Sequence, residues 1–182
     1  MHKALVLLAP LLLAATPAMA QTAAEPPIPA SGLARTAQNP QIDYQTFSRL
    51  VSELGPLRES RRLSWADFAK AASSGNAVLL DARSADAYAR GHLKGAVNLP
   101  FTDFTAEALR AVLGDNPDRP IYIYCNNNFS DHRAPVPLKA APLALNIPTF
   151  INLHGYGYRN IWELADVIGS TDADVIWETA AN

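Results

Sequence analysis

The chain has 182 residues, of which 49% are hydrophobic and 18% are charged, and its formal net charge is −2. This length and hydrophobic content are sufficient for one domain with a real core. A nearly neutral chain without a basic stripe or a polybasic segment argues against binding to nucleic acid or to anionic lipid.

Residues 1–20 have the layout of a secretory signal peptide. Met1-His2-Lys3 is a short basic start, residues 4–15 form an apolar run broken only by a proline, and Ala18-Met19-Ala20 supplies small residues at the cleavage positions. The apolar run is short for a bilayer span, so a retained membrane anchor is the less favoured alternative. We expect cleavage before Gln21 and a secreted protein, most simply periplasmic, with no membrane anchor afterwards.

Residues 21–41 are rich in alanine, proline and small polar residues, which predicts a disordered lead before a single domain at 42–182. Within this domain, apolar periodicity and capping residues predict elements in chain order. The predicted helices are 43–54, 64–73, 84–90, 105–113, 138–145 and 158–168, and the predicted strands are 77–80, 96–99, 121–124 and 149–153. Gly55-Pro56 is expected to end the first helix, and residues 175–177 could pack back as an edge strand.

Strands that alternate with helices favour an α/β fold, with a central, mostly parallel sheet flanked by helices on both faces. The strand at 77–80 is apolar throughout, as expected for a strand buried on both faces. Ligand chemistry in such sheets gathers at the carboxyl ends of the strands. Asp81 and Cys125 each follow a predicted strand directly, so they are the first candidates for a site.

Cys125 is the only cysteine, so it cannot form an internal disulfide. It is either a small buried hydrophobe or a residue used for chemistry. The loop Asn126–Arg133 leads toward the next helix, and backbone N–H groups in such a loop would stabilise a thiolate and lower the pKa of the thiol. Arg133 would add positive charge and Asp131 would oppose it, while the asparagines that begin the loop would tolerate positive φ. An ordinary polar surface loop is the alternative.

On this hypothesis Cys125 is catalytic, and the residues expected to bind substrate are Asn126, Asn127, Asn128, Phe129, Ser130 and Arg133. A protonated His132 would raise the thiolate fraction, although solvation at the surface is the favoured role for this side chain. Asp81 and Arg83 are further auxiliary candidates, but pairing with each other at the strand end is favoured over contact with substrate. The histidines and the cysteine lack the spacing of metal ligands, so neither a metal site nor a cofactor is expected.

Three stretches of the chain carry a resemblance to a known family. Residues 78–100, VLLDARSADAYARGHLKGAVNLP, combine a strand that ends in Asp-x-Arg, a short helix with a tyrosine, and a Gly-His-x-x-Gly-Ala turn before a strand that ends in proline. The other two stretches are IYIYC at 121–125 and FINLHGYGYRNIWEL at 150–164. Over residues 64–168 the chain resembles the rhodanese (thiosulfate sulfurtransferase) homology domain, with an atypically long active-site loop.

The resemblance implies a rhodanese-like fold and a double-displacement mechanism. The thiolate of Cys125 would take the outer sulfur of a small sulfur-containing anion as a persulfide and pass it to a thiol or cyanide acceptor. The loop departs from the family pattern, because the fifth residue after the cysteine is Ser130, the first arginine is Arg133, and no glycine is present. Cysteine phosphatases of this architecture need an arginine where this chain has Asp131, so phosphatase chemistry is disfavoured.

The expected function is therefore an exported sulfurtransferase or persulfide carrier. A non-catalytic rhodanese-fold module, which binds a protein partner or senses thiols, is the alternative from a different class. A thiol oxidoreductase is less favoured, because no second cysteine could resolve a mixed disulfide.

Overall fold

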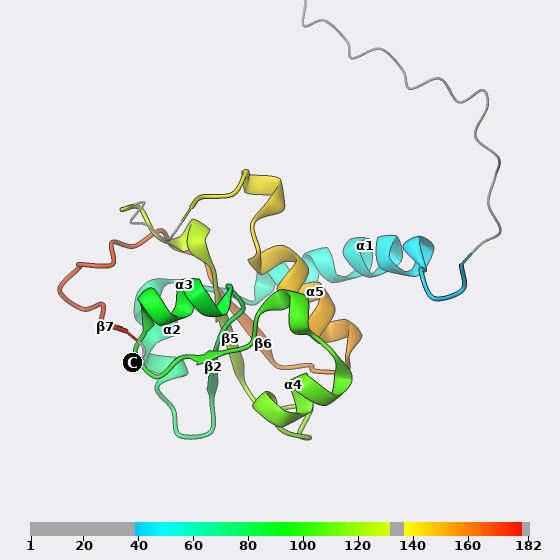
Figure 1. Ribbon diagram of the computed structural model, residues 1–182, viewed down its shortest axis with the longest axis horizontal. Coiled ribbons are helices and arrows are strands. Elements are labelled where there is room, and N and C mark those ends of the chain that lie inside the picture. Colours follow the sequence, from blue (N-terminus) through cyan, green and yellow to red (C-terminus); the bar gives the residue numbers. More distant parts are fainter. Residues whose placement is uncertain (1–38, 132–136, 180–182) are drawn as a thin grey trace, which may run out of the picture. The chain divides into compact units, whose positions relative to one another are not determined.

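Helices and strands alternate along the chain in the computed structural model, which describes residues 39–131 and 137–179 (Figure 1). The predicted signal peptide, almost all of the predicted lead, His132 and Arg133 lie outside the described residues. The helices are α1 (Tyr44–Ser60), α2 (Trp65–Ala72), α3 (Ala85–Arg90), α4 (Ala106–Leu113) and α5 (Asn146–Gly155). The strands are β1 (Arg62–Leu63), β2 (Val78–Asp81), β3 (His92–Leu93), β4 (Val97–Asn98), β5 (Ile121–Tyr124), β6 (Ile161–Leu164) and β7 (Trp177–Glu178). Short 3-10 turns occupy Phe101–Asp103, Asn126–Asn128 and Ala141–Leu143.

Five strands form the central sheet in the order β1-β6-β5-β2-β4, and every neighbouring pair is parallel. Strand β5 lies in the middle of this sheet, between β6 and β2. The chain therefore leaves β5 after Tyr124 at the centre of the carboxyl edge, which is where ligand sites of parallel sheets form. A separate two-stranded sheet pairs β3 with β7 antiparallel, so part of the tail does pack back as a strand.

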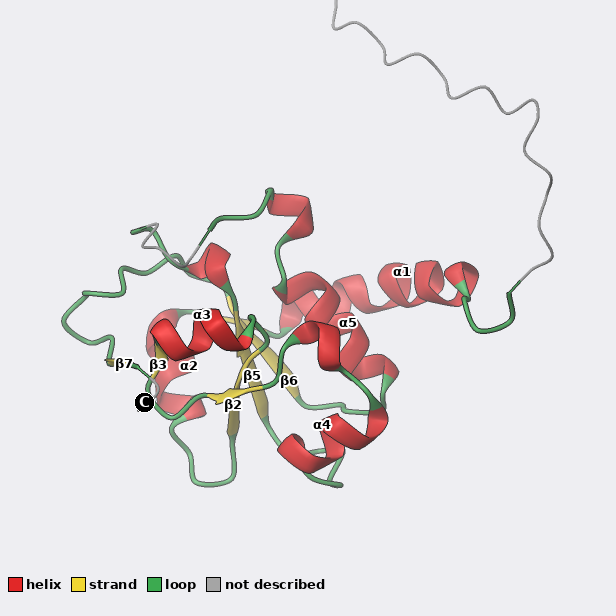
Figure 2. Cartoon of the chain, in the orientation of Figure 1, coloured by secondary structure: helices red, strands yellow, loops and turns green. Residues whose placement is uncertain are grey.

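Alternate residues of the central strands face two separate apolar clusters. Leu80, Ile121 and Ile123 pack with side chains of α1, α4 and α5, whereas Leu79 and Tyr122 pack with side chains of α2 and α3. Figure 2 shows these two groups of helices on opposite sides of the strands. Each large apolar side chain that is buried contributes about 1.5–3 kcal/mol, so strands that are apolar on both faces specify a sheet covered on both sides. The predicted fold class is confirmed.

The last two predicted elements have the opposite types. Residues 149–153, predicted as a strand, lie in helix α5, and residues 158–168, predicted as a helix, contain strand β6. Short apolar runs fit either period. The helix is favoured because Ile147 and Ile151, four residues apart, both pack into the same apolar cluster. Gly157, with a φ of 104°, makes the turn that separates α5 from β6.

Two further boundaries differ from the prediction. Gly55-Pro56 does not end the first helix, which continues to Ser60. Pro56 cannot donate a backbone hydrogen bond, but Leu54 and Leu57, on either side of it, both pack against the core and hold the helix in place. Residues 138–145, predicted as a helix, contain only a short 3-10 turn, since Pro142 lacks a backbone donor. Within the part of the chain that the structure describes, no helix combines the length and the apolar character needed to cross a membrane.

Candidate active site around Cys125

Cys125 follows β5 at the carboxyl edge of the sheet, and only 1% of its surface is exposed. The thiol faces the beginning of α5. The backbone N–H groups of Leu145 and Asn146 act on the sulfur as hydrogen-bond donors, together with the N–H group of Asn127. First-turn N–H groups and the helix dipole both favour negative charge at this position. The backbone donors around the sulfur therefore come from two segments, the loop that follows Cys125 (the cysteine loop) and the start of α5.

The pKa of the Cys125 thiol is nevertheless raised above its ordinary value. Burial is the largest cause, because it disfavours the charged thiolate. The three N–H donors lower the pKa without outweighing burial, and the carboxylate of Glu163 raises it further. The prediction of a lowered thiol pKa is therefore wrong, because the sequence indicated the donors but not the depth of burial.

The three asparagines after Cys125 form a 3-10 turn and are explained by the hydrogen bonds of their side chains. Such a turn has negative φ, so tolerance of positive φ is not what these positions need. Nδ2 of Asn126 donates to the carbonyl oxygen of Pro137 at 3.1 Å. Asn127 exchanges two hydrogen bonds with the backbone of Lys139, at 2.8 and 3.2 Å. The turn therefore holds the segment before α5 against the cysteine loop.

Asn128 is the buried support of the loop. Its Oδ1 accepts the backbone N–H of Cys125 at 2.9 Å and Nδ2 of Asn146 at 3.0 Å. Its own Nδ2 donates to the carbonyl oxygens of Leu164 and Asp166, at 2.9 and 3.0 Å. Both donors and both acceptor positions of the amide are thus in use. Asn128 lies next to Cys125 but has no amide position left for a substrate.

The last two predicted contacts in the described loop point elsewhere. Phe129 is buried in the apolar cluster on the α2 side of the sheet, where its ring packs edge-on against Trp177 at 5.0 Å. Ser130 is exposed, and its backbone N–H donates to the carbonyl oxygen of Ile168 at 3.0 Å. The structure therefore places Phe129 in the core and not beside the sulfur.

The auxiliary candidates Asp81 and Arg83 form a buried ion pair at the end of β2. Nη2 of Arg83 lies 2.6 Å from Oδ2 of Asp81, and Nε lies 2.9 Å from Oδ1. The hydroxyl of Tyr124 donates to Oδ2 of the same carboxylate at 2.7 Å. This bidentate geometry with a third donor supports the structural role favoured from the sequence. The roles of His132 and Arg133, which lie outside the described residues, stay predictions.

A buried polar network next to Cys125 was not predicted. Glu163 in β6 is only 3% exposed, and Nη2 of Arg58 in α1 reaches its Oε1 at 2.5 Å. Nδ2 of Asn146 lies 3.3 Å from the same oxygen and 3.0 Å from Oδ1 of Asn128. These contacts join α1, β6, α5 and the cysteine loop. The signal in the sequence is Glu163, an acidic residue inside the apolar run 161–164. The sequence predicts this run as part of a helix, so the signal does not identify the network.

A cavity of about 390 Å³ is lined by neighbours of Cys125, although Cys125 itself does not line it. Asn126 and Leu145, which flank the sulfur in the loop and before α5, form part of its wall, together with Arg83, Phe101 and Lys139. Apolar surface with the ammonium group of Lys139 suits a small anion or an organic thiol that carries negative charge, whereas the charge of Arg83 is compensated by Asp81. Among the described residues, the wall contains no histidine or acid, and no three metal-binding side chains form a group.

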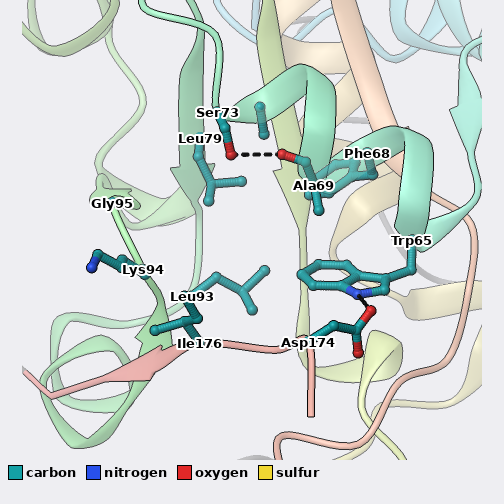
Figure 3. A pocket seen from close by; sticks show the side chains of 11 residues that line it. Trp65, Phe68, Ala69, Ser73, Leu79, Leu93, Lys94, Gly95, Asp174 and Ile176 are labelled. Carbon is teal, nitrogen blue, oxygen red and sulfur yellow. Dashed lines mark hydrogen bonds between the residues drawn. The ribbon is translucent and has the colours of Figure 1, made fainter. Parts of the chain in front are cut away.

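A second hollow, of about 350 Å³, lies on the α2 side of the sheet (Figure 3). Phe68 and Leu79 belong to its apolar wall. Figure 3 shows Trp65 and Asp174 at one end, where the indole N–H donates to the carboxylate at 2.6 Å, and Lys94 at the other end. Its wall belongs to the α2 cluster, so this hollow is separate from the thiol site.

Comparisons with known proteins place these features in a family. The family model described as "Rhodanese-like domain" matches residues 64–165, more than half of the chain. The chain is similar to a thiosulfate sulfurtransferase from Pseudomonas aeruginosa, with 25% identity over 65% of this chain and 20% of that one and a TM-score of 0.44. It is also similar to the rhodanese-like domain of the Alr3790 protein from Anabaena sp., with 18% identity over 65% and 79% of the two chains and a TM-score of 0.45. For a rhodanese with anions from E. coli the identity is 20% over 57% and 98%, and the TM-score is 0.37. No protein of curated function matches the sequence.

Proposed function

The chain belongs to the rhodanese-like domain family, and we propose that it is a sulfurtransferase or sulfur carrier that forms a persulfide on Cys125. One observation carries the proposal. The only cysteine follows the central strand of a parallel sheet and has three backbone N–H donors around its sulfur. Donors fixed in this way stabilise negative charge on a sulfur nucleophile without having to reorganise during the reaction.

The proposed reaction consists of two displacements. The thiol of Cys125 first loses its proton to water, and the thiolate attacks the outer sulfur of the donor. The S–S bond of the donor breaks, and its electron pair leaves with the remainder, which is sulfite when the donor is thiosulfate. A thiol or cyanide acceptor then attacks the outer sulfur of the persulfide, and the electron pair returns to Cys125. The N–H groups of Asn127 and Asn146 face the negative sulfur in both steps.

The proposed substrates are a small sulfur-containing anion as donor and a thiol or a small anion as acceptor. Lys139 in the wall of the neighbouring cavity supports an anionic ligand, and Phe101 and Leu145 support an apolar part. Because Cys125 is almost fully covered, its sulfur must become accessible before it can react.

Mass spectrometry of the whole protein after incubation with thiosulfate tests the proposal. The expected result is a gain of one sulfur atom, which cyanide removes and which a Cys125→Ser variant does not show. Because Cys125 is the only cysteine, the adduct needs no further mapping. A folded protein that gains no sulfur from thiosulfate would contradict the proposal.

The burial of the thiol favours a second candidate function, a rhodanese-fold module that binds a partner or senses thiols without catalysis. A covered cysteine with a raised pKa is what a packing residue would show. Slow alkylation of Cys125 at neutral pH together with no sulfur adduct would support this module, whereas an adduct would exclude the purely structural role.

We also propose export to the periplasm, on the sequence of residues 1–20 alone. Sequencing of the amino terminus of the mature protein tests this proposal. Gln21 at the first position is the expected result, and Met1 at that position would contradict it.

A further inference from the structure

Glu163 places a carboxylate on the same side of the sheet as Cys125. The register of β5 and β6 pairs Ile123 with Glu163. Side chains two residues apart along a strand share a face, so Ile123, Cys125 and Glu163 all point toward the side covered by α1 and α5. The carboxylate therefore lies inside the protein next to the thiol site.

The surroundings of Glu163 satisfy only part of its carboxylate. Oε1 receives Nη2 of Arg58 at 2.5 Å and Nδ2 of Asn146 at 3.3 Å. Oε2 is buried and has no hydrogen-bond partner among the described residues, and the same holds for Oδ1 of Asn146 and Oγ1 of Thr149. Burial of incompletely paired polar atoms costs free energy. The ion pair between Glu163 and Arg58 is therefore not explained by its contribution to stability alone.

We infer that Glu163 is a positioning residue for Cys125: its carboxylate lies on the same face of the sheet as the sulfur, and its hydrogen bond to Asn146 aligns the groups around the sulfur. Nδ2 of Asn146 donates to both Glu163 and Asn128, and Asn128 holds the backbone N–H of Cys125. The N–H group of Asn146 itself faces the sulfur. A shift of the Glu163 side chain would therefore displace the groups around the sulfur in two ways, through Asn146 in α5 and through Asn128 in the loop after Cys125.

The other charged groups near the thiol do not replace Glu163. Among the described residues, the other charged or titratable side chains on the elements packed around Cys125 include Asp81, Arg83, Asp131, Lys139, His154, Asp166, Tyr124 and Arg58. The first two neutralise each other, and the carboxylates of Asp131 and Asp166 accept hydrogen bonds from Ser170 and from the backbone of Trp65. Glu163 is the carboxylate that acts directly on the thiol.

The pH profile of alkylation tests the inference, because the only cysteine is the only site for iodoacetamide. The midpoint of the profile reports ionisation of the thiol, and the plateau at high pH reports its accessibility. For Glu163→Gln we expect the midpoint to move to lower pH, so that the rate at neutral pH rises about three- to ten-fold. The plateau should stay within about twofold of wild type, because the accessibility of the sulfur is unchanged.

A merely structural role for Glu163 gives a different result. A loosened loop would raise the alkylation rate at every pH, plateau included, and would leave the midpoint in place. That result, or a profile identical to wild type, overturns the inference. The matched control is Glu59→Gln, since Glu59 is the exposed carboxylate that also contacts Arg58, at 3.3 Å, and its removal should leave the midpoint unchanged.

A second variant keeps the inference testable if Glu163→Gln does not fold. Glu163→Gln combined with Arg58→Gln removes both buried charges, and its midpoint should still lie below that of wild type, because the carboxylate of Glu163, and not the guanidinium of Arg58, acts on the thiol. An unmoved midpoint in this folded double variant also overturns the inference. The inference concerns the thiol of the proposed function, but alkylation needs no persulfide, so a missing sulfur adduct contradicts only the proposed function.

Discussion

The amide oxygen of Asn128 accepts the backbone N–H of Cys125 at 2.9 Å, so a side chain three residues along the chain holds the only cysteine in place. The same amide binds Asn146 at the start of α5 and two carbonyl oxygens at the end of β6. One side chain therefore joins the three elements that surround the sulfur, and the position of the thiol depends on it.

Replacement of Asn128 by alanine should strongly destabilise the protein. It would leave the N–H group of Cys125 and the carbonyl oxygen of Leu164 buried with a partner missing, and each such group costs about 1–3 kcal/mol. We expect the free energy of unfolding to fall by about 2–4 kcal/mol in urea denaturation. The control is Asn127→Ala, which removes exposed hydrogen bonds and should cost at most about 1 kcal/mol. Equal losses in the two variants would contradict the role of Asn128.

The ion pair between Asp81 and Arg83 should matter more for stability than exposed pairs do. Removal of one partner leaves a buried charge without compensation, which costs about 3–5 kcal/mol. Asp81→Ala should therefore lower the free energy of unfolding by that amount in thermal or urea denaturation. The matched control is Asp86→Ala, which breaks an exposed pair with Arg90 and should cost less than about 1 kcal/mol. Similar losses for both variants would show that the buried pair has no special weight.

The sequence predicted the parts of the site that depend on local order and on strand ends. Cys125 and Asp81 could be placed at the carboxyl edge of a parallel sheet, because each follows an apolar run directly. The support from Glu163 and Asn146 could not be predicted, because it depends on contacts between β6 and α5, and the types of these two elements were predicted the wrong way round. Burial depth was missed for the same reason, and it reversed the direction of the thiol pKa shift.

A cation in the cavity wall should assist reaction with an anionic donor. Lys139→Ala removes the cationic side chain there that has no buried counter-charge, and we expect the rate of sulfur transfer from thiosulfate to Cys125 to fall about two- to five-fold at low salt, since an exposed charge contributes modestly. The difference should shrink at high salt because ions screen exposed charges. Lys94→Ala, at the hollow on the α2 side, is the control and should change the rate little. Equal effects of the two variants would place the donor elsewhere.

The raised pKa of the Cys125 thiol makes the stability of the protein depend on pH in a defined direction. The folded protein holds the thiol proton more tightly than the unfolded chain, where the pKa is about 8.5. The stabilising contribution is therefore complete below about pH 8.5 and is lost as the pH rises from there through the folded pKa. We expect the difference in unfolding free energy between wild type and Cys125→Ala to fall as the pH rises from about 7.5 to about 9.5, by at most about 1.4 kcal/mol per pH unit. The comparison removes the contributions of other groups, which both proteins share. A difference that stays constant over this range would mean that the thiol is not buried in the folded protein in solution.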